Sequence, residues 1–137
     1  MQPSTILIVG TGALANLFAA RIALAGASVS MLGTWPEGIA AIQARGIRLA
    51  DSEGGERSIP VSATDDPAEC VGTRLALVLV KAWQTERAAR QLAECLHPQG
   101  IALSLQNGLG NREILADVLG ESRVELGSTT TGATLLG

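Results

Sequence analysis

The apolar run LALVLVK at residues 75–81 restricts the fold of this chain more than any other segment. Six apolar residues in succession leave no polar face, so a strand built from them must be covered on both sides. Strands of this kind are typical of central positions in parallel sheets, where crossover helices cover both faces. The run ends in Lys81, a cation placed where a buried strand emerges.

Strand-type and helix-type segments alternate along the rest of the chain. Further strands are predicted at residues 4–10, 27–32, 101–108 and within 122–137, and helices at 13–26, 36–46, 85–100 and 111–120. We expect Pro98 and Gly100 to end the third helix. Residues 46–61 predict a hairpin or an irregular excursion, and residues 64–73 a short helical or looped connection. This order predicts one doubly wound, Rossmann-type α/β domain over residues 1–137, with a mostly parallel sheet and helices on both faces.

Composition argues against several classes of partner. The chain has 10 basic and 13 acidic residues, a net charge of −3 and few aromatic residues, so a nucleic-acid groove is not expected. No apolar run approaches the ~18 residues that span a bilayer, and we expect a cytoplasmic protein with no membrane partner. Cys70 and Cys95 lie 25 residues apart without histidines at ligand spacing. They indicate reduced thiols rather than a metal site.

The segment GTGALA, residues 10–15, follows the first predicted strand and begins the first helix. A dinucleotide-binding turn occupies this place in a Rossmann fold. Gly10 suits the tight turn, Gly12 lets the backbone approach a pyrophosphate, and Ala15 stands where the third glycine is often replaced. The helix start, with Thr11, Ala13 and Leu14, adds amide donors for phosphate. The alternative is a glycine-containing turn that binds nothing.

The end of the second strand bears on which nucleotide is bound. Sites for NAD usually carry an acidic residue there for the ribose 2′-hydroxyl. This chain has Gly33, Thr34 and Trp35 instead, which favours NADP, with Thr34 as a hydrogen-bond donor and Arg45 or Arg48 as possible helpers. Trp35 either covers the adenine or caps the following helix against the core.

Lys81 and the pair Asn107-Gly108 follow two different predicted strands. In a parallel sheet both emerge at the carboxyl edge, which also carries the glycine turn. A lysine there neutralises cofactor phosphate, and an asparagine amide both donates to and accepts from a ribose or a substrate oxygen. The alternatives are a solvated lysine and an ordinary Asn-Gly turn.

Four motifs together resemble one family. GTGALA, VKAWQT, LQNGLGN and GSTTTGA, in this order, resemble the N-terminal domain of ketopantoate reductase (2-dehydropantoate 2-reductase) over essentially the whole chain. The resemblance implies NADPH-dependent reduction of 2-dehydropantoate to pantoate, a step towards pantothenate and coenzyme A. It places cofactor contacts on residues 10–15, Lys81, Asn107 and Ala133, with Asn107 also touching substrate. Thr34 matches the position where such enzymes often place an arginine for the 2′-phosphate.

The resemblance also implies a helical C-terminal domain that is absent from this chain. That domain carries the family's general-acid lysine and most of its substrate contacts. We therefore expect no catalytic residue within these 137 residues, no activity from them alone, and a surface that packs against that domain or a second subunit. His97 is expected to be a structural cap at a helix end.

Two other functions fit parts of the sequence. A non-enzymatic nucleotide-sensing module, such as the cytosolic regulatory domain of a potassium transport system, is also a single Rossmann unit of about this length. It has no need for KAWQT or QNGLG. A related reductase acting on another 2-oxo acid would keep the redox chemistry and change only the substrate.

Overall fold

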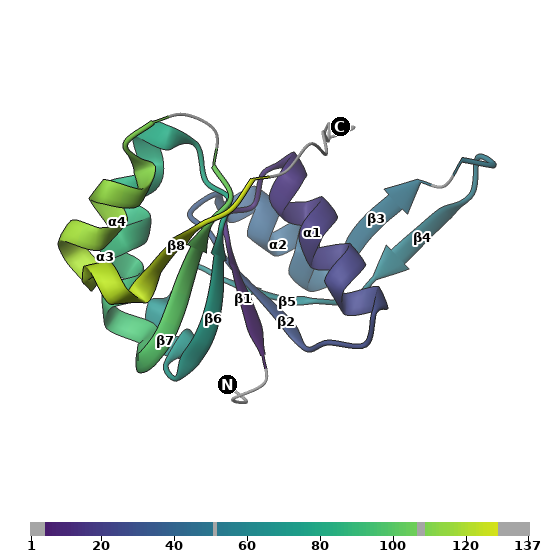
Figure 1. The fold of residues 1–137 in the computed structure, drawn as a ribbon. Helices are drawn as coiled ribbons and strands as arrows, with labels where there is room; N and C mark the ends of the chain where they lie inside the picture. Colours follow the sequence, from purple (N-terminus) through teal and green to yellow (C-terminus); the bar gives the residue numbers. More distant parts are fainter. Residues whose placement is uncertain (1–4, 51, 107–108, 129–137) are drawn as a thin grey trace.

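Six parallel strands form the central sheet of the computed structural model, which describes residues 5–50, 52–106 and 109–128 (Figure 1). The strand order is β5-β2-β1-β6-β7-β8, and each pair of neighbours is parallel. The strands are β1 (Ile6–Val9), β2 (Val29–Leu32), β5 (Ser62–Thr64), β6 (Thr73–Val78), β7 (Leu96–Ser104) and β8 (Val124–Leu126). The chain winds outward from β1 in both directions, which confirms the doubly wound prediction.

Helices cover both faces of this sheet, as Figure 1 shows. Helices α1 and α2 lie on one face, and α3 and α4 lie on the other. Their bounds are α1 (Ala13–Leu24), α2 (Pro36–Arg45), α3 (Thr85–Cys95) and α4 (Asn111–Leu119), with short 3₁₀ turns η1 (Pro67–Cys70), η2 (Ala82–Gln84) and η3 (Glu121–Arg123). The turn η1 confirms the short helical connection predicted within residues 64–73.

The central strands are buried on both sides. Ala76 and Val78 of β6, and Val80 just after the strand, pack into the core on the α3 and α4 side. Leu77 packs into the second core, which contains the buried alanines of α1. This division explains why residues 75–80 are apolar without alternation.

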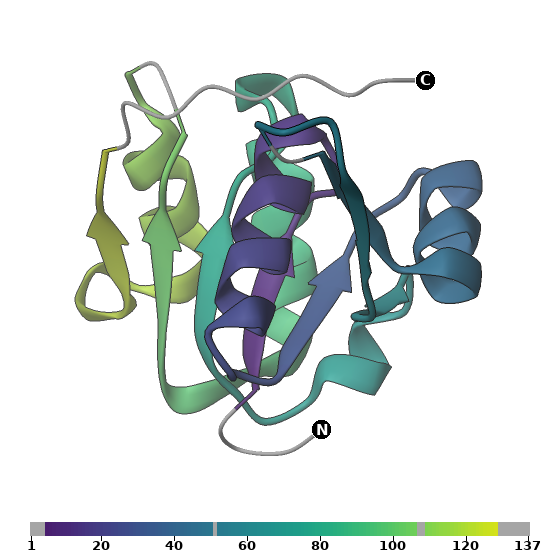
Figure 2. The same cartoon turned by 90° about the vertical axis from the view of Figure 1, so that its right-hand side faces the viewer.

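Strands β3 (Ile47–Ala50) and β4 (Glu56–Ile59) form a separate antiparallel ribbon beside α1 (Figure 2). Ile47 pairs with Ile59, and both side chains are buried in the core on the α1 side. The hairpin alternative for residues 46–61 is therefore confirmed. Gly46, with φ of 71°, ends α2 and begins the ribbon, as expected for a helix stop.

The predicted end of the third helix is wrong. Helix α3 ends at Cys95 and β7 begins at Leu96, so Pro98 and Gly100 lie inside a strand and do not end the helix. The pairing of β7 with β6 shifts here, from Thr73 opposite Leu96 to Leu75 opposite Ile101. A proline without an amide proton is tolerated in such a bulge because no ladder hydrogen bond is needed there.

Two further features differ from simple sequence expectations. Strand β5 is a three-residue edge strand on β2, too short and polar to be recognised just after the predicted hairpin region. Helix α1 buries its small residues, Ala15, Ala19 and Ala20, while Leu24 is 46% exposed. Alanines on the buried face let the helix approach the sheet closely.

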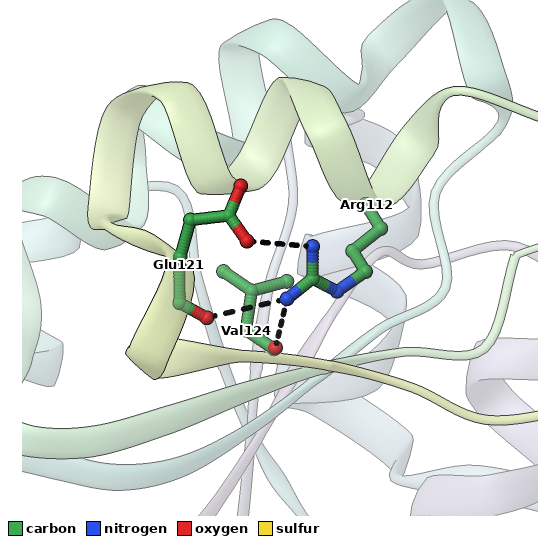
Figure 3. Close-up of polar contacts among 3 residues, drawn as sticks. All are labelled: Arg112, Glu121 and Val124. Carbon is green, nitrogen blue, oxygen red and sulfur yellow. Dashed lines mark hydrogen bonds and ion pairs between the residues drawn. The ribbon is translucent and has the colours of Figure 1, made fainter.

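Arg112 connects helix α4 to the edge strand β8 (Figure 3). One terminal nitrogen donates to the Glu121 carboxylate at 3.2 Å. The other donates to the backbone carbonyls of Glu121 at 3.3 Å and Val124 at 3.4 Å. One side chain from α4 therefore satisfies carbonyls in η3 and at the start of β8, and holds the edge strand against the helix.

Candidate functional site

The chain changes direction at β1, which lies between β2 and β6. Parallel strands of this topology open a crevice at their carboxyl ends, and ligands bind at such a switch point. Backbone hydrogen bonds tie the three strand ends together. The amide of Gly10 donates to Leu32 at 2.8 Å, and the amide of Leu79 donates to Val9 at 3.0 Å.

The glycines of the turn after β1 have different tasks. Gly10 has φ of 127°, a conformation that side-chain-bearing residues rarely adopt. A Cβ added there would lie 3.3 Å from the Leu79 carbonyl carbon. Gly12 precedes α1 with φ of −77°, and a Cβ added there would meet no atom within 4 Å. The protein itself therefore needs a glycine at position 10, whereas the open space over Gly12 is available to a ligand.

A pocket of about 220 Å³ opens at these strand ends. It is lined by Gly10, Thr11, Gly12, Gly33, Thr34, Trp35, Leu79, Val80, Lys81, Gln84 and Arg87. Five of the predicted cofactor contacts, from three separate segments, thus lie together: Gly10, Thr11, Gly12, Thr34 and Lys81. Ala13, Leu14 and Ala15 form the first turn of α1 behind the glycine turn and do not line the pocket. Asn107 and Ala133 lie outside the described residues.

The charge of the pocket is opposite to that of the chain. Lys81 and Arg87 line it, and no acidic side chain does, although the chain carries a net charge of −3. The other candidate helpers for a 2′-phosphate are elsewhere. Arg45 does not line the pocket, and Arg48 pairs with Glu56 at 3.7 Å on the β3–β4 ribbon.

Two polar lining residues, Gln84 and Arg87, were not predicted from the sequence. The side chain of Gln84 accepts a hydrogen bond from the Lys81 amide at 3.2 Å and shapes the turn that follows β6. Arg87 follows in α3, and its Nε is buried without a hydrogen-bond partner among the described residues. The motif KAWQT contains Gln84, but an arginine inside an amphipathic helix carries no sequence signal that distinguishes it from a solvated one.

Trp35 stands at the start of α2 and also lines the pocket. Its ring packs over Gly38 in the first turn of α2, where a Cβ would collide with the ring. The residue is nevertheless 50% exposed and lines the pocket, so part of its side chain is accessible to a ligand. An aromatic surface supported from behind in this way suits a flat ligand group.

A buried polar network holds the strand ends beneath the pocket. Gln106 donates to the Val80 carbonyl at 3.0 Å and to the Thr85 hydroxyl at 2.7 Å, and accepts from Ser104 at 2.9 Å. The Thr85 hydroxyl donates in turn to Asn111 at 3.0 Å. The network connects the ends of β6 and β7 with the starts of α3 and α4. It therefore fixes the segment that carries Lys81, Gln84 and Arg87.

Other polar features lie away from this pocket. A larger cavity, about 320 Å³, is lined by five hydroxyl-bearing residues and Glu69, with no cation to attract phosphate. His97 opens β7 at the opposite edge, accepts from the Gln99 amide at 3.0 Å and lies 3.3 Å from Arg74. The predicted helix-end cap is wrong, because α3 ends at Cys95 and His97 lies within β7, where it does not line the pocket.

The cysteines are buried and free. Burial raises the pKa of the Cys70 thiol to about 11 and that of Cys95 to about 12. No group of metal-binding side chains occurs within the described ranges, and no helix there is long and apolar enough to cross a membrane.

Comparisons with known proteins point to one family. The sequence model described as ketopantoate reductase PanE/ApbA matches residues 6–137. A 2-dehydropantoate 2-reductase from Archaeoglobus fulgidus is 35% identical over 135 residues, which are 98% of this chain and 42% of the relative. The chain thus spans about two fifths of the length of such curated relatives.

Solved structures share the fold. A PanE/ApbA family ketopantoate reductase from Ralstonia eutropha JMP134 superposes with a TM-score of 0.79 and 31% identity, over 90% of this chain and 40% of that one. A D-mandelate dehydrogenase determined with NADH and anilino(oxo)acetate reaches 0.87 at 23% identity, over 97% of this chain and 43% of that one. At that identity the second likeness concerns the fold alone.

Proposed function

The chain belongs to the PanE/ApbA family of ketopantoate reductases, and from this we propose that residues 1–137 are the NADPH-binding Rossmann domain of a 2-dehydropantoate 2-reductase. One observation supports the cofactor site above the others. The pocket at the switch point holds two cations, no acid, and an open space over Gly12. This combination fits a polyanionic dinucleotide better than a neutral metabolite.

Each residue has a proposed task in binding. The glycine turn of residues 10–12 and the first amides of α1, at Ala13, Leu14 and Ala15, receive the pyrophosphate. Lys81 neutralises phosphate charge from the rigid end of β6. Asn107 and Ala133 are proposed contacts through the family resemblance, with Asn107 also touching substrate.

The choice of NADPH rests on the end of β2. Thr34 lines the pocket and its hydroxyl is proposed to donate to the 2′-phosphate. No carboxylate stands there to repel that group or to bind a free 2′-hydroxyl. NADPH is therefore favoured over NADH.

The reaction needs more than this chain is proposed to provide. The bound cofactor supplies hydride to the carbonyl carbon of a 2-oxo acid, and reduction also needs a proton donor for the carbonyl oxygen. Curated relatives are more than twice as long as the residues they share with this chain. We propose that the 137 residues alone bind cofactor without turnover, and that donor and most substrate contacts belong to a helical domain or a second subunit.

Calorimetric titration tests the cofactor assignment. The purified chain is titrated with NADPH and then with NADH at one fixed salt concentration, and we expect the tighter binding for NADPH. Lys81→Ala is expected to weaken NADPH binding roughly tenfold, the worth of one charge-assisted contact. Arg21→Ala, which removes an exposed cation from the last turn of α1, is the matched control and should bind as the parent does.

Three results would contradict the proposal. Absence of NADPH and NADH binding would show that the pocket is not a nicotinamide-nucleotide site in this chain. Equal loss in both variants would show only a general charge effect, because Arg21 does not line the pocket. Turnover of 2-dehydropantoate by the 137 residues would refute the claim that they lack activity.

A further inference from the structure

Arg87 belongs to a different part of the fold from Thr34, the residue after β2 that was considered for a 2′-phosphate. It lies in the first turn of α3, on the sheet face that α1 and α2 do not cover (Figure 1). Its side chain nevertheless lines the same pocket as Thr34, Trp35 and Lys81. The pocket at the end of β2 therefore also contains a cation from α3.

The guanidinium of Arg87 is paired with no carboxylate among the described residues. Its Nε is buried without a hydrogen-bond partner, and its side chain makes no ion pair within the part of the chain that the structure describes. Arg90, one turn later, pairs with Glu86 at 2.6 Å. Arg123 also has an unpartnered Nε, but its terminal nitrogens donate to three backbone carbonyls. Arg87 thus leaves a buried donor unused, and such a group costs free energy until a partner arrives.

The surroundings of Arg87 are unfavourable to a cation in the absence of ligand. The start of α3 is the positive end of that helix dipole. Lys81 lines the same pocket, and no carboxylate lies among the lining residues. Three sources of positive potential therefore meet in one small cavity. An anion with more than one charge relieves all of them together.

We propose that Arg87 binds the 2′-phosphate of NADPH and supplies the charge that Thr34 lacks. The inference rests on the proposed cofactor function. The pyrophosphate has its own donors at the glycine turn, whereas the adenine ribose of a Rossmann ligand lies at the end of the second strand, beside Thr34. A guanidinium presents a planar fork that matches phosphate oxygens, and Lys81 adds a point charge beside it.

The test compares ligands with and without a 2′-phosphate. Arg87→Gln removes the charge, Arg87→Lys keeps it without the fork, and Arg90→Gln is the control in the same helix outside the pocket. Each variant is titrated by calorimetry with NADPH, NADH, adenosine 2′,5′-bisphosphate and adenosine 5′-diphosphate at fixed salt. Circular dichroism and urea unfolding verify that each variant is folded.

A selective loss is expected. Arg87→Gln should weaken NADPH and the 2′,5′-bisphosphate roughly tenfold to hundredfold, as for one buried charge-assisted contact, and change the other two ligands by less than about threefold. Arg87→Lys should fall between that variant and the parent, since the charge remains. Arg90→Gln should match the parent, because its partner Glu86 is exposed.

Three outcomes would overturn the inference. Unchanged NADPH binding by Arg87→Gln would show that the side chain does not contact the cofactor. Equal weakening of NADPH and NADH would assign Arg87 to a part that both ligands share. A parent chain that binds neither would refute the proposed function and the inference together, whereas the first two outcomes refute the inference alone.

Discussion

The two glycines at positions 10 and 12 are expected to respond in opposite ways to alanine. At Gly12 the backbone angles of −77° and −174° suit alanine, and the new Cβ meets no atom within 4 Å. Lower entropy of the unfolded chain then stabilises by about 0.4–1 kcal/mol. Loss of glycine as the residue before a helix offsets this by a similar amount. We expect Gly12→Ala to change the free energy of unfolding by less than about 1 kcal/mol.

Gly10→Ala is the matched comparison. The φ of 127° forces alanine into a conformation that costs on the order of 1–3 kcal/mol. The Cβ would also press on the Leu79 carbonyl carbon at 3.3 Å. This variant should therefore lose stability, whereas Gly12→Ala should keep it.

For NADPH binding, Gly12→Ala is expected to be harmful although it leaves the protein stable. The methyl group at position 12 occupies the space through which a pyrophosphate approaches the turn, so NADPH affinity should fall at least about tenfold in a fully folded protein. Urea unfolding gives the stabilities, and calorimetry gives the affinities. Parent-like NADPH binding by Gly12→Ala would refute the account of the turn, as would parent-like stability of Gly10→Ala.

Other predictions concern the scaffold. Arg112→Met should cost about 1 kcal/mol of unfolding free energy because two backbone carbonyls lose their donor, while Glu121→Gln should cost less than about 0.5 kcal/mol because Glu121 is 80% exposed; urea unfolding measures both. Thr85→Val should cost roughly 1–3 kcal/mol in the same assay, since it removes the buried hydroxyl that accepts from Gln106 and donates to Asn111. The raised pKa of Cys70 and of Cys95 means that folding favours the neutral thiols. Their contribution to the free energy of unfolding should therefore be fully present below pH 9.0 and be lost as the pH rises towards 11. An unfolding free energy that does not change over this pH range would contradict the burial of the two thiols.

The order of the elements could be predicted because burial restricts which residue types can occur in each element. A strand covered on both faces must be apolar throughout, as residues 75–80 are, and a helix that stops in a left-handed residue needs glycine, as at Gly46. The end of α3 could not be predicted in the same way. Pro98 and Gly100 end helices in general, and only the shifted pairing with β6 allows them within a strand.

Some residues of the candidate site could also be predicted from the sequence, and others could not. Residues 10–12 and Lys81 were found because they follow strands, and parallel topology brings strand ends together. Arg87 was missed because its role depends on which neighbours surround it. Its neighbour Arg90 has the same chemistry in the same helix, and only the three-dimensional arrangement shows that one is paired and the other is not.

Amide chemical-shift mapping of the ¹⁵N-labelled chain during titration with NADPH tests the central claim most directly. If the cofactor binds at the carboxyl edge, the largest shifts should occur at Gly10, Gly12, Thr34 and Arg87, with little change around the larger cavity near Ser62. Shifts concentrated at that second cavity, or spread without a centre, would contradict the assignment of the switch-point pocket as the cofactor site.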